Sequence, residues 1–459
     1  MKKSRLAKLL SDSIIFAIGN IGTKVIMFIM IPIYTFFLTP ANYGVLDIAI
    51  TTVTLLTPIA TLSVFDAVFR FSLDKQDTKL IISNGSLISL IGTLVTLLVG
   101  LVISFITGSE LYLLVSIMIA LNVWLSFFQN FSRGMGQNKL FISLGLVSAF
   151  VGSISTFLLL INYPTVNSVL LGNILGLIVA NLLGTLAFLK SNYFSSSHIS
   201  KTYILKLIRY SIPLIPNAVA WWMTNDIARF IILIFIGSYG NGIYAVASKI
   251  PALLTIFFGI FNQAWQITAI KEIDSVDNSY FYSKVFNSLM IISLLGTSVM
   301  TIAIKPIMHL IVQNNYFESW KLVPILLLSV VFSNLSAFVG SIYVAAKNTN
   351  KIMFTTFLGM LVNTLSTLIL IPLIGIQGAG VGSFIGFFII LWVRLHTTRD
   401  IVKIKMNYVI LSSNLAIILI QFTLLLLNFT FAYVVDVFIL LALVLIDVYF
   451  MKNGKYNHV

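Results

Sequence analysis

Ionisable residues interrupt the most apolar stretches of this sequence. Lys24, Asp47, Asp226, Arg229 and Lys249 each lie within or next to a long hydrophobic segment. Placing a charged side chain near the middle of a membrane-spanning helix costs about 2.5 to 3.5 kcal/mol, and such residues usually face a bundle interior or a wet cavity. Cations in a cavity bind anions, and carboxylates bind cations. The positions of these residues therefore predict a polar cavity that binds a charged group.

Polar and small residues follow two of these segments at the spacing of one helix face. Residues at intervals of three and four share one side of a helix. Each such face packs as a polar seam between helices or lines a cavity, and Asp47 favours the cavity. The first series is Asp47, Thr51, Thr54, Pro58 and Thr61. The second series is Tyr244, Ser248, Pro251, Thr255, Gly259, Asn262 and Gln266.

Two pairs of opposite charges each allow a structural and a functional interpretation. Asp226 and Arg229 are close enough in sequence to pair along one helix, and such a pair fixes helix register as readily as it serves binding. Lys24 shares a helix face with Asn20 but has no acidic neighbour within its own helix. A cross-helix pair with Asp47 is its structural interpretation, and an anionic substrate is its functional one.

The composition is that of a polytopic membrane protein. Hydrophobic residues make up 59% of the 459 positions and charged residues 9%, and the mean hydropathy is +1.03. Soluble chains carry about 25% charged residues. No segment is polar enough to form a soluble catalytic domain. Cations on cytoplasmic loops explain the net charge of +14 better than nucleic-acid binding does, and the absence of cysteine excludes disulfides and thiolate metal sites.

Apolar stretches long enough to cross about 30 Å of hydrocarbon recur along the chain. We therefore predict an all-α polytopic membrane protein with about 14 transmembrane helices. The basic start of the chain is expected to precede a retained first helix rather than a cleaved signal peptide. The predicted spans are 12–38, 43–69, 80–106, 111–131, 140–161, 167–189, 208–236, 242–270, 282–312, 320–346, 352–373, 378–397, 406–427 and 431–451.

Lysine and arginine gather on alternate predicted loops. This alternation predicts an even number of spans with both termini in the cytoplasm, because positive residues concentrate in cytoplasmic loops. The loop near Asn314 is an exception, since Lys305 and Lys321 flank it. The predicted cytoplasmic cations are Arg70, Lys75, Lys79, Arg133, Lys139, Lys190, Lys201, Lys206, Arg209, Lys271, Lys284, Lys347, Lys351, Arg394, Arg399, Lys403, Lys405, Lys452 and Lys455.

Short similar segments recur in the two halves of the sequence, about 200 residues apart. Residues 43–49 resemble residues 241–247, and residues 171–176 resemble residues 381–386. Each pair holds the same place within a set of six predicted helices, which indicates a parallel repeat with a substrate path between its halves. The predicted N-terminal lobe, C-terminal lobe and two-helix hairpin with its cytoplasmic tail occupy 1–200, 201–400 and 401–459.

The linker between the predicted lobes, residues 190–206, is the most polar part of the chain. At its end, apolar residues alternate with Lys201, Lys206 and Arg209. This pattern indicates a short amphipathic helix on the cytoplasmic surface. A plain connector is the simplest interpretation of this segment.

Enzyme motifs are not found in the sequence. Its four histidines are scattered without metal-ligand spacing, and no phosphate-binding loop or nucleophile elbow occurs. We therefore predict that the chain is not an enzyme and holds no cofactor. Because an ATP-binding motif is missing, transport is expected to be passive or coupled to an ion gradient or to the membrane potential.

Three segments of the first predicted hairpin resemble a known transporter family. Residues 31–34, 38–44 and 65–70 are similar to Wzx-type polysaccharide flippases of the multidrug/oligosaccharidyl-lipid/polysaccharide exporter superfamily. The resemblance implies two six-helix lobes around a central cavity that opens alternately to each side. It also implies a substrate oligosaccharide on polyprenyl pyrophosphate, with Lys24, Arg229 and Arg70 as cations for the anionic head.

The helices after the twelfth resemble an extra hairpin of the flippases for lipid-linked peptidoglycan precursors, in which that hairpin lines a lipid groove. This chain has fewer cavity arginines than those flippases. The difference argues against a peptidoglycan precursor as its substrate.

Three functions fit these features to different degrees. A flippase for lipid-linked oligosaccharide in a bacterial cytoplasmic membrane agrees best, with membrane lipids and polysaccharide assembly proteins as further partners and no nucleic acid. A drug or cation antiporter of the same superfamily would use carboxylates for cationic substrates. A membrane glycan polymerase or ligase would need a large outer loop, and the predicted outer loops are short. The predicted substrate-binding residues are Lys24, Arg229, Arg70, Asp47, Asp226 and Lys249.

Overall fold

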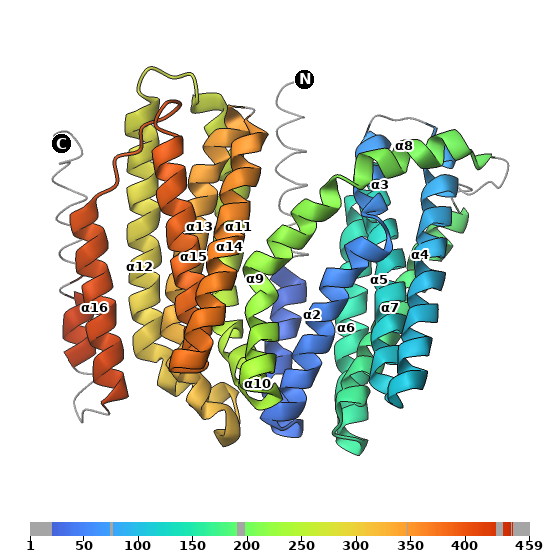
Figure 1. Cartoon of the computed structure of the whole chain (residues 1–459), viewed down its shortest axis with the longest axis horizontal. Coiled ribbons are helices and arrows are strands. Elements are labelled where there is room, and N and C mark those ends of the chain that lie inside the picture. Colours follow the sequence, from blue (N-terminus) through green and yellow to red (C-terminus); the bar gives the residue numbers. More distant parts are fainter. Residues whose placement is uncertain are drawn as a thin grey trace. The chain divides into compact units, whose positions relative to one another are not determined.

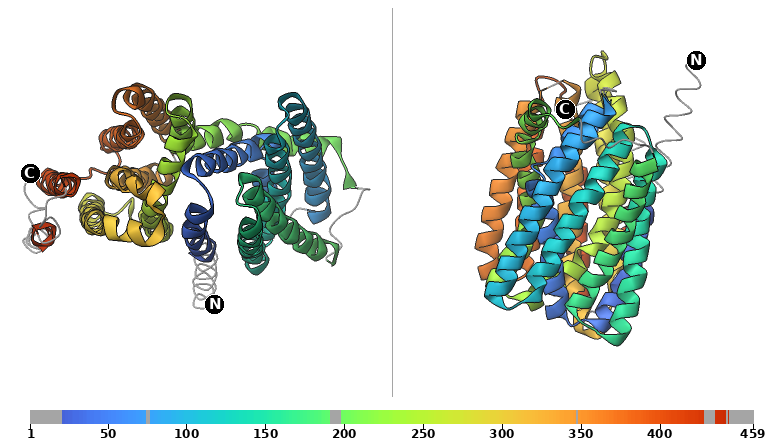
Figure 2. Two further views of the ribbon diagram at one scale, coloured as in Figure 1. Left: turned by 90° about the horizontal axis from the view of Figure 1, so that it is seen from below. Right: turned by 90° about the vertical axis from the view of Figure 1, so that its right-hand side faces the viewer.

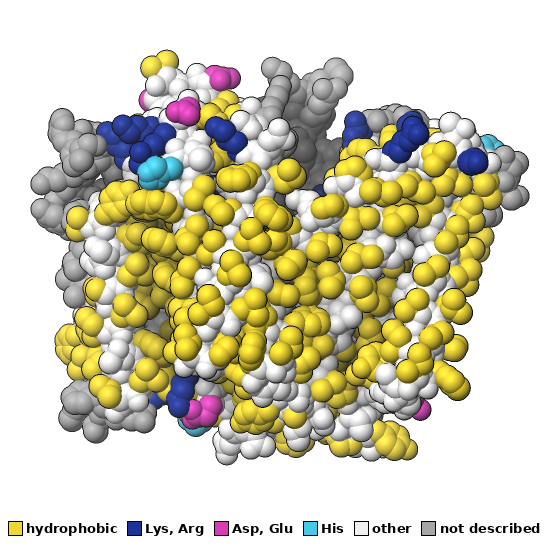
Figure 3. All heavy atoms as spheres, in the orientation of Figure 1, with side chains coloured by type: hydrophobic (Ala, Val, Ile, Leu, Met, Phe, Trp, Pro, Cys, Tyr) yellow, Lys and Arg dark blue, Asp and Glu magenta, His cyan; other side chains and the backbone are white. Residues whose placement is uncertain are grey.

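The computed structural model describes residues 21–73, 77–190, 198–346, 348–427, 435–441 and 443. Within these ranges all regular elements are helices, and twelve segments are long and apolar enough to cross a membrane (Figure 1, Figure 2). Hydrophobic side chains cover the sides of the helices, whereas lysine and arginine gather near their ends (Figure 3). The predicted all-α polytopic membrane fold is therefore confirmed.

The helices follow the predicted spans. Every span predicted up to 406–427 coincides with one helix or with consecutive helices, beginning with the helix Ile21–Phe37. The last predicted span, 431–451, lies largely outside the described residues, and Asn20, Lys75, Lys347, Lys452 and Lys455 also lie outside them. The other elements are α2 (Pro40–Ala60), α3 (Val64–Leu73), α4 (Thr78–Thr107), α5 (Glu110–Gly134), α6 (Asn138–Asn162), α7 (Val166–Lys190), α8 (Lys201–Ser211), α9 (Leu214–Phe235), α10 (Ser238–Ala247), α11 (Lys249–Glu272), α12 (Asn278–Ile311), the 3₁₀ helix η2 (Asn314–Leu322), α13 (Val323–Ala345), α14 (Thr349–Ile374), α15 (Gln377–Thr397) and α16 (Tyr408–Leu426).

The second predicted span is interrupted shortly after Pro58. Leu62 and Ser63 separate α2 from α3, and both adopt left-handed backbone conformations with φ of 51°. The Ser63 amide donates to the Pro58 carbonyl at 2.7 Å, which closes this turn. A left-handed conformation costs a residue with a Cβ about 1 to 2 kcal/mol. The polar series that begins at Asp47 therefore belongs to α2 and ends at a constrained turn rather than continuing along one straight helix.

The eighth predicted span is divided in a similar way. Ser248 separates α10 from α11. Pro251 has no backbone N–H to donate to the Ala247 carbonyl, and the Ser248 hydroxyl donates to the Ala245 carbonyl at 2.8 Å. The first interruption directly follows the last member of its polar series, Thr61, and the second falls on a member of its series, Ser248.

Contacts divide the chain into two compact units, Met1–Trp222 and Met223–Val459, which are described separately. The division falls within α9, and α8 packs with the first unit. Leu207 of α8 is buried against Val64 and Ala67 of α3 and Ile88 of α4. The lobe boundaries at residues 200 and 400 stay a prediction.

Glycines bring α6 and α7 of the first unit close together. A Cβ on Gly176 would lie 2.6 Å from the backbone nitrogen of Gly152, and a Cβ on Gly172 would overlap the backbone of Thr156. Small residues at such seams allow membrane helices to approach closely. The close packing of α6 against α7 therefore depends on glycine, which has no side chain, at positions 172 and 176.

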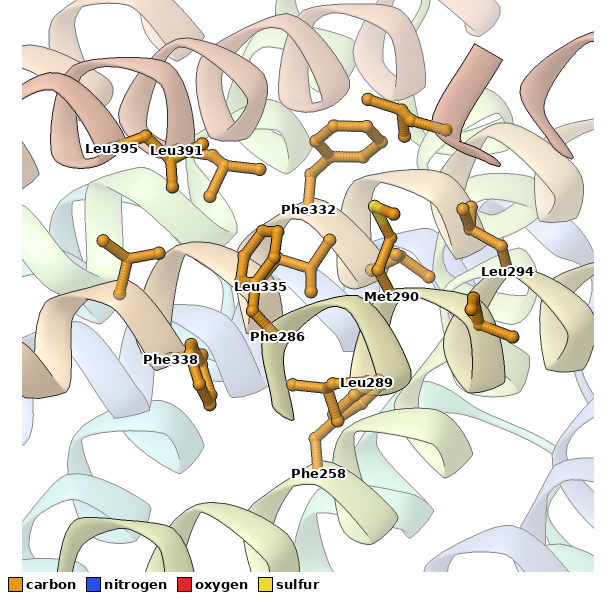
Figure 4. Close-up of a cluster of buried hydrophobic side chains, with 14 of the residues drawn as sticks. Phe258, Phe286, Leu289, Met290, Leu294, Phe332, Leu335, Phe338, Leu391 and Leu395 are labelled. Atoms are coloured by element: carbon orange, nitrogen blue, oxygen red, sulfur yellow. The ribbon is translucent and has the colours of Figure 1, made fainter. Parts of the chain in front are cut away.

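Large side chains form the core of the second unit (Figure 4). Phe286 of α12 and Phe338 of α13 are fully buried there, and Trp265 of α11 stacks on Phe338 with 4.3 Å between ring centroids. The indole N–H of Trp265 donates to the Ser341 hydroxyl at 2.9 Å. The N–H group of the largest ring in this core thus has a hydrogen-bond partner within the protein.

Arg394 departs from its predicted position among the loop cations. It lies in α15 with 7% of its surface exposed. Its guanidinium donates to the Ser336 carbonyl at 2.8 Å and to the hydroxyls of Thr355 and Thr356 at 3.1 Å. Gly340 leaves room for the guanidinium, because a Cβ there would lie 2.7 Å from Nη1. Arg394 therefore joins α13, α14 and α15 instead of extending from a loop.

Gly176→Ala is expected to lower the melting temperature of the detergent-solubilised protein, because the added methyl group overlaps the backbone of α6. Overpacking of this kind costs about 1 to 3 kcal/mol. Gly259→Ala on α11 is the control, since a Cβ there has nothing within 4 Å and alanine favours a helix over glycine by up to about 1 kcal/mol. An unchanged melting temperature for Gly176→Ala would contradict the close α6–α7 packing.

Candidate functional site

A cavity of about 170 Å³ lies among five helices of the second unit, α9, α10, α11, α13 and α15. Polar side chains make up much of its wall, and Arg229 of α9 is the charged residue among them. Its lining residues are Thr224, Asn225, Arg229, Tyr244, Ser248, Pro251, Ala252, Thr255, Leu326, Ser329, Val330, Ser383 and Phe387. This arrangement places a cation beside hydroxyl and amide groups within an otherwise apolar bundle.

One wall of the cavity comes from the polar series predicted in the eighth span. Tyr244, Ser248, Pro251 and Thr255 all line it, although the helix is interrupted at Ser248. The later members of the series, which follow Thr255, do not line the cavity. The interpretation of this face as a cavity wall rather than a packing seam therefore holds for its first half.

Arg229 is held by contacts on two sides. Its guanidinium forms an ion pair with Asp226, and the Asp226 and Arg229 side chains are 29% and 14% exposed. The guanidinium carbon also lies 5.8 Å from the centre of the Tyr244 ring, a cation–π distance. A guanidinium carries five N–H donors in a planar fork, more than one carboxylate accepts. Arg229 therefore presents a planar cation with several donors at the wall of the cavity.

Hydrogen bonds between helices fix the positions of the cavity walls. The Asn363 side chain of α14 donates to the Thr224 carbonyl of α9 at 2.6 Å. The Ser329 hydroxyl of α13 lies 3.1 Å from the Gly380 carbonyl of α15, which accepts its hydrogen bond. These bonds hold the helix that carries Arg229 and the opposite wall in place.

The remaining predicted site residues have different environments. Lys24 lies on an exposed surface of the helix Ile21–Phe37, whereas Asp47 of α2 is 8% exposed. Arg70 is exposed in the last turn of α3. Lys249 is half-buried at the start of α11, next to the cavity residue Ser248. The structure thus brings Asp226 and Arg229 together as an ion pair. Lys24 and Asp47 differ in burial, since Lys24 is exposed and Asp47 is buried.

The sequence patterns missed the wall opposite Arg229. Ser329 and Phe387 belong to α13 and α15. Ser329 carried a signal that the prediction did not use, because Ser333 and Ser336 follow it at intervals of four and three, whereas Phe387 is apolar. Ser383 carried a signal, since it lies in the segment 381–386 that resembles 171–176. Periodicity identifies one face of one helix, so it does not reveal which other helices complete a cavity.

Comparison with known families decides the identity of the chain. The family described as "Polysaccharide biosynthesis protein" matches residues 9–266, which is more than half of the sequence. The chain belongs to this family. The match covers Lys24, Arg229 and the cavity wall from Tyr244 to Thr255, and no curated protein sequence matches the chain.

Solved structures share the fold of this polysaccharide biosynthesis family member. "Lipid II flippase MurJ, inward closed conformation" matches with a TM-score of 0.67 and 14% identity over 96% of this chain and 99% of its own. An inward-facing MATE family multidrug resistance transporter of the MOP superfamily matches with a TM-score of 0.65 and 13% identity, over 82% and 94% of the two chains. A mutant of the Vibrio cholerae MATE transporter VcmN matches with a TM-score of 0.57 and 13% identity, over 86% and 97%. The predicted resemblance to a polysaccharide biosynthesis family is confirmed by the family model, and the solved structures show that this multi-pass membrane protein shares its fold with MurJ and MATE transporters.

A double-mutant cycle tests the pairing of Asp226 with Arg229. Asp226→Asn and Arg229→Gln are each expected to lower the unfolding free energy, and the double variant is expected to lose less than the sum. Neighbouring charges of this kind couple by about 0.5 to 3 kcal/mol. The cycle is measured by thermal or denaturant unfolding in detergent. Strictly additive losses would contradict an energetically coupled pair.

Proposed function

We propose that the protein flips a lipid-linked oligosaccharide from the inner to the outer leaflet of a bacterial cytoplasmic membrane. The substrate is an oligosaccharide on polyprenyl pyrophosphate, carried by alternating access for surface polysaccharide synthesis. The observation that carries this proposal is Arg229 in a polar cavity of a polysaccharide biosynthesis family member. The MurJ structure of the same fold, titled a lipid II flippase, supports a lipid-linked cargo.

The physical problem of such transport is the pyrophosphate. A charged group loses its hydration when it enters hydrocarbon, at a cost far above that of a neutral polar group. Arginine binds phosphate oxygens through parallel N–H donors. The hydroxyls of Ser248 and Thr255 could donate to further oxygens only by giving up their bonds to the Ala245 and Pro251 carbonyls. The cavity therefore replaces part of the water that the pyrophosphate loses.

The size of the cavity limits what enters it. Sites for whole small molecules usually measure about 300 to 1,000 Å³, whereas this cavity measures about 170 Å³. It holds a phosphate group or one sugar, not a complete oligosaccharide. The proposal accordingly assigns it to the charged head, with Lys24, Arg70, Asp47, Asp226 and Lys249 as further substrate-contacting residues.

Drug or cation antiport is the second candidate function. Asp226 stands beside the cavity, and MATE transporters share the fold. An antiporter of cationic drugs would depend on the carboxylates Asp47 and Asp226. It would not depend on Lys24, whose charge repels such a substrate.

Arg229→Gln is expected to abolish surface polysaccharide in a strain that relies on this gene, because the pyrophosphate loses its cation. Lipid-linked oligosaccharide should accumulate in the cytoplasmic leaflet. Lys24→Gln should also lower the amount of surface polysaccharide. Arg229→Lys keeps the charge and should retain part of the activity. Surface glycan is measured by immunoblot or sugar analysis, with protein level checked in each strain.

Arg399→Gln provides the control, since Arg399 is an exposed arginine of the same unit that does not line the cavity. It should leave the polysaccharide normal. Normal polysaccharide in both Arg229→Gln and Lys24→Gln would contradict the anion-binding role. Recovery of activity in Arg229→Gln combined with Asp226→Asn would instead assign the ion pair a structural role. Loss of drug resistance in Asp47→Asn with normal polysaccharide would favour antiport.

A further inference from the structure

The first unit contains a large apolar groove that transport does not explain. It measures about 640 Å³ and lies between α4, α5 and α7. Trp124, Phe127 and Phe128 of α5 and Phe188 of α7 form its aromatic wall, and the rings of Phe128 and Phe188 lie 4.8 Å apart. None of the described residues that line it is charged. The groove therefore suits a hydrocarbon chain rather than a polar head.

The groove is open along its side. Leu90 of α4 and Leu189 of α7 line it and remain 43% and 67% exposed. Both helices belong to the segments that are long and apolar enough to cross a membrane, so an exposed apolar side chain there faces lipid. A lipid chain can enter this groove from the bilayer without crossing a polar surface.

A basic cavity of about 530 Å³ lies at the α8 end of this unit. Lys206 and Arg209 of α8 line it together with Ser200 and Thr202. Lys206 Nζ lies 4.6 Å from the centre of the Phe71 ring, which orients the ammonium group over α3. The dark-blue side chains over α8 in Figure 3 mark this cationic end.

Neighbouring residues of the same two segments line the groove and the basic cavity. On α4, Leu80 lines the basic cavity and Ile82 lines the groove; in the linker, Ser200 and Ile199 divide in the same way. Asn84 ties the two segments together, because it donates to the His198 carbonyl at 2.9 Å and accepts from the Ser200 amide at 2.8 Å. The apolar groove and the basic cavity are thus both built on α4 and on the segment that precedes α8.

The nearby carboxylate does not cancel this positive charge. Asp77 lies 3.9 Å from His198 and accepts the Lys79 amide at 2.9 Å at the start of α4. The carboxylate keeps its negative charge in these contacts, so Lys206 and Arg209 together exceed it by one positive charge. Lys206 and Arg209 are both exposed.

We propose that this composite site binds one anionic phospholipid of the leaflet on the α8 side. Its acyl chain occupies the groove, and its phosphate contacts Lys206 and Arg209. Basic pockets beside membrane helices bind anionic head groups in this way, with about 1 kcal/mol for each lysine or arginine. The bound lipid fastens α8 to α3 and α4, and its site shares no lining residue with the Arg229 cavity.

Fluorescence quenching by brominated lipids tests this proposal on the full chain, because Trp124 lies in the groove. The Trp124 signal is taken as the difference between the wild type and Trp124→Phe. Phosphatidylglycerol with brominated chains should quench it more strongly than phosphatidylcholine with the same chains. Lys206→Gln and Arg209→Gln should each weaken the phosphatidylglycerol preference by about fivefold.

Lys139→Gln is the matched control, since Lys139 is a cation at the start of α6 in the same unit that lines neither the groove nor the basic cavity, and it should leave the preference unchanged. Thr185→Phe fills the groove from an exposed position and should reduce quenching by both lipids, whereas Thr185→Val should not. Unfolding of each variant in detergent without added lipid checks that the changes act on binding.

Equal quenching by the two lipids, or a preference that survives both charge removals, would overturn the proposal. Displacement of phosphatidylglycerol by an equimolar amount of lipid-linked oligosaccharide would also overturn it, because the groove would then belong to the substrate tail. Loss of the preference on adding inorganic phosphate alone, with Trp124 still fully quenched, would assign the cations to free phosphate instead of a lipid head.

Discussion

The structure depends on one constraint: charged and hydrogen-bonding groups in hydrocarbon must find partners within the protein. Backbone groups meet this constraint through helices, which explains why every regular element among the described residues is helical. Two prolines that lack a backbone donor lie close to breaks in the helices. The Ser248 hydroxyl bonds a carbonyl of α10 beside Pro251, and a turn closed by Ser63 follows Pro58.

Two arginines of the second unit meet the same constraint in opposite ways. Arg394 donates hydrogen bonds to one carbonyl and two threonine hydroxyls, and these bonds join three helices. Almost none of its surface is exposed. Arg229 has a carboxylate partner and an aromatic ring, yet it also borders a cavity. A buried cation locked by neutral oxygens stabilises a fold, whereas a cation beside open space can receive an anion. This difference of surroundings makes Arg229 the centre of the proposed site.

The sequence allowed the helices and one wall of the cavity to be predicted, because both depend on local pattern. Hydropathy located the spans, and the spacing of Tyr244, Ser248, Pro251 and Thr255 identified residues that do line one cavity. The pattern did not reveal the opposite wall from α13 and α15, which depends on packing between helices far apart in sequence. It also misplaced Arg394, because charge alone does not distinguish a loop cation from one that neighbouring helices enclose. The left-handed turn at Leu62 and Ser63 was not predicted, because neither residue is the glycine that usually marks such a conformation.

Direct observation of flipping tests the central claim that this transporter fold moves a pyrophosphate-linked glycan past Arg229. The purified protein is reconstituted into vesicles that contain a polyprenyl-pyrophosphate oligosaccharide, and a membrane-impermeant oxidant that attacks the glycan is added outside. With the wild-type protein, the glycan of the inner leaflet should become reactive over time, whereas Arg229→Gln vesicles should expose only the outer-leaflet pool. Equal exposure in wild-type, Arg229→Gln and protein-free vesicles would contradict the account.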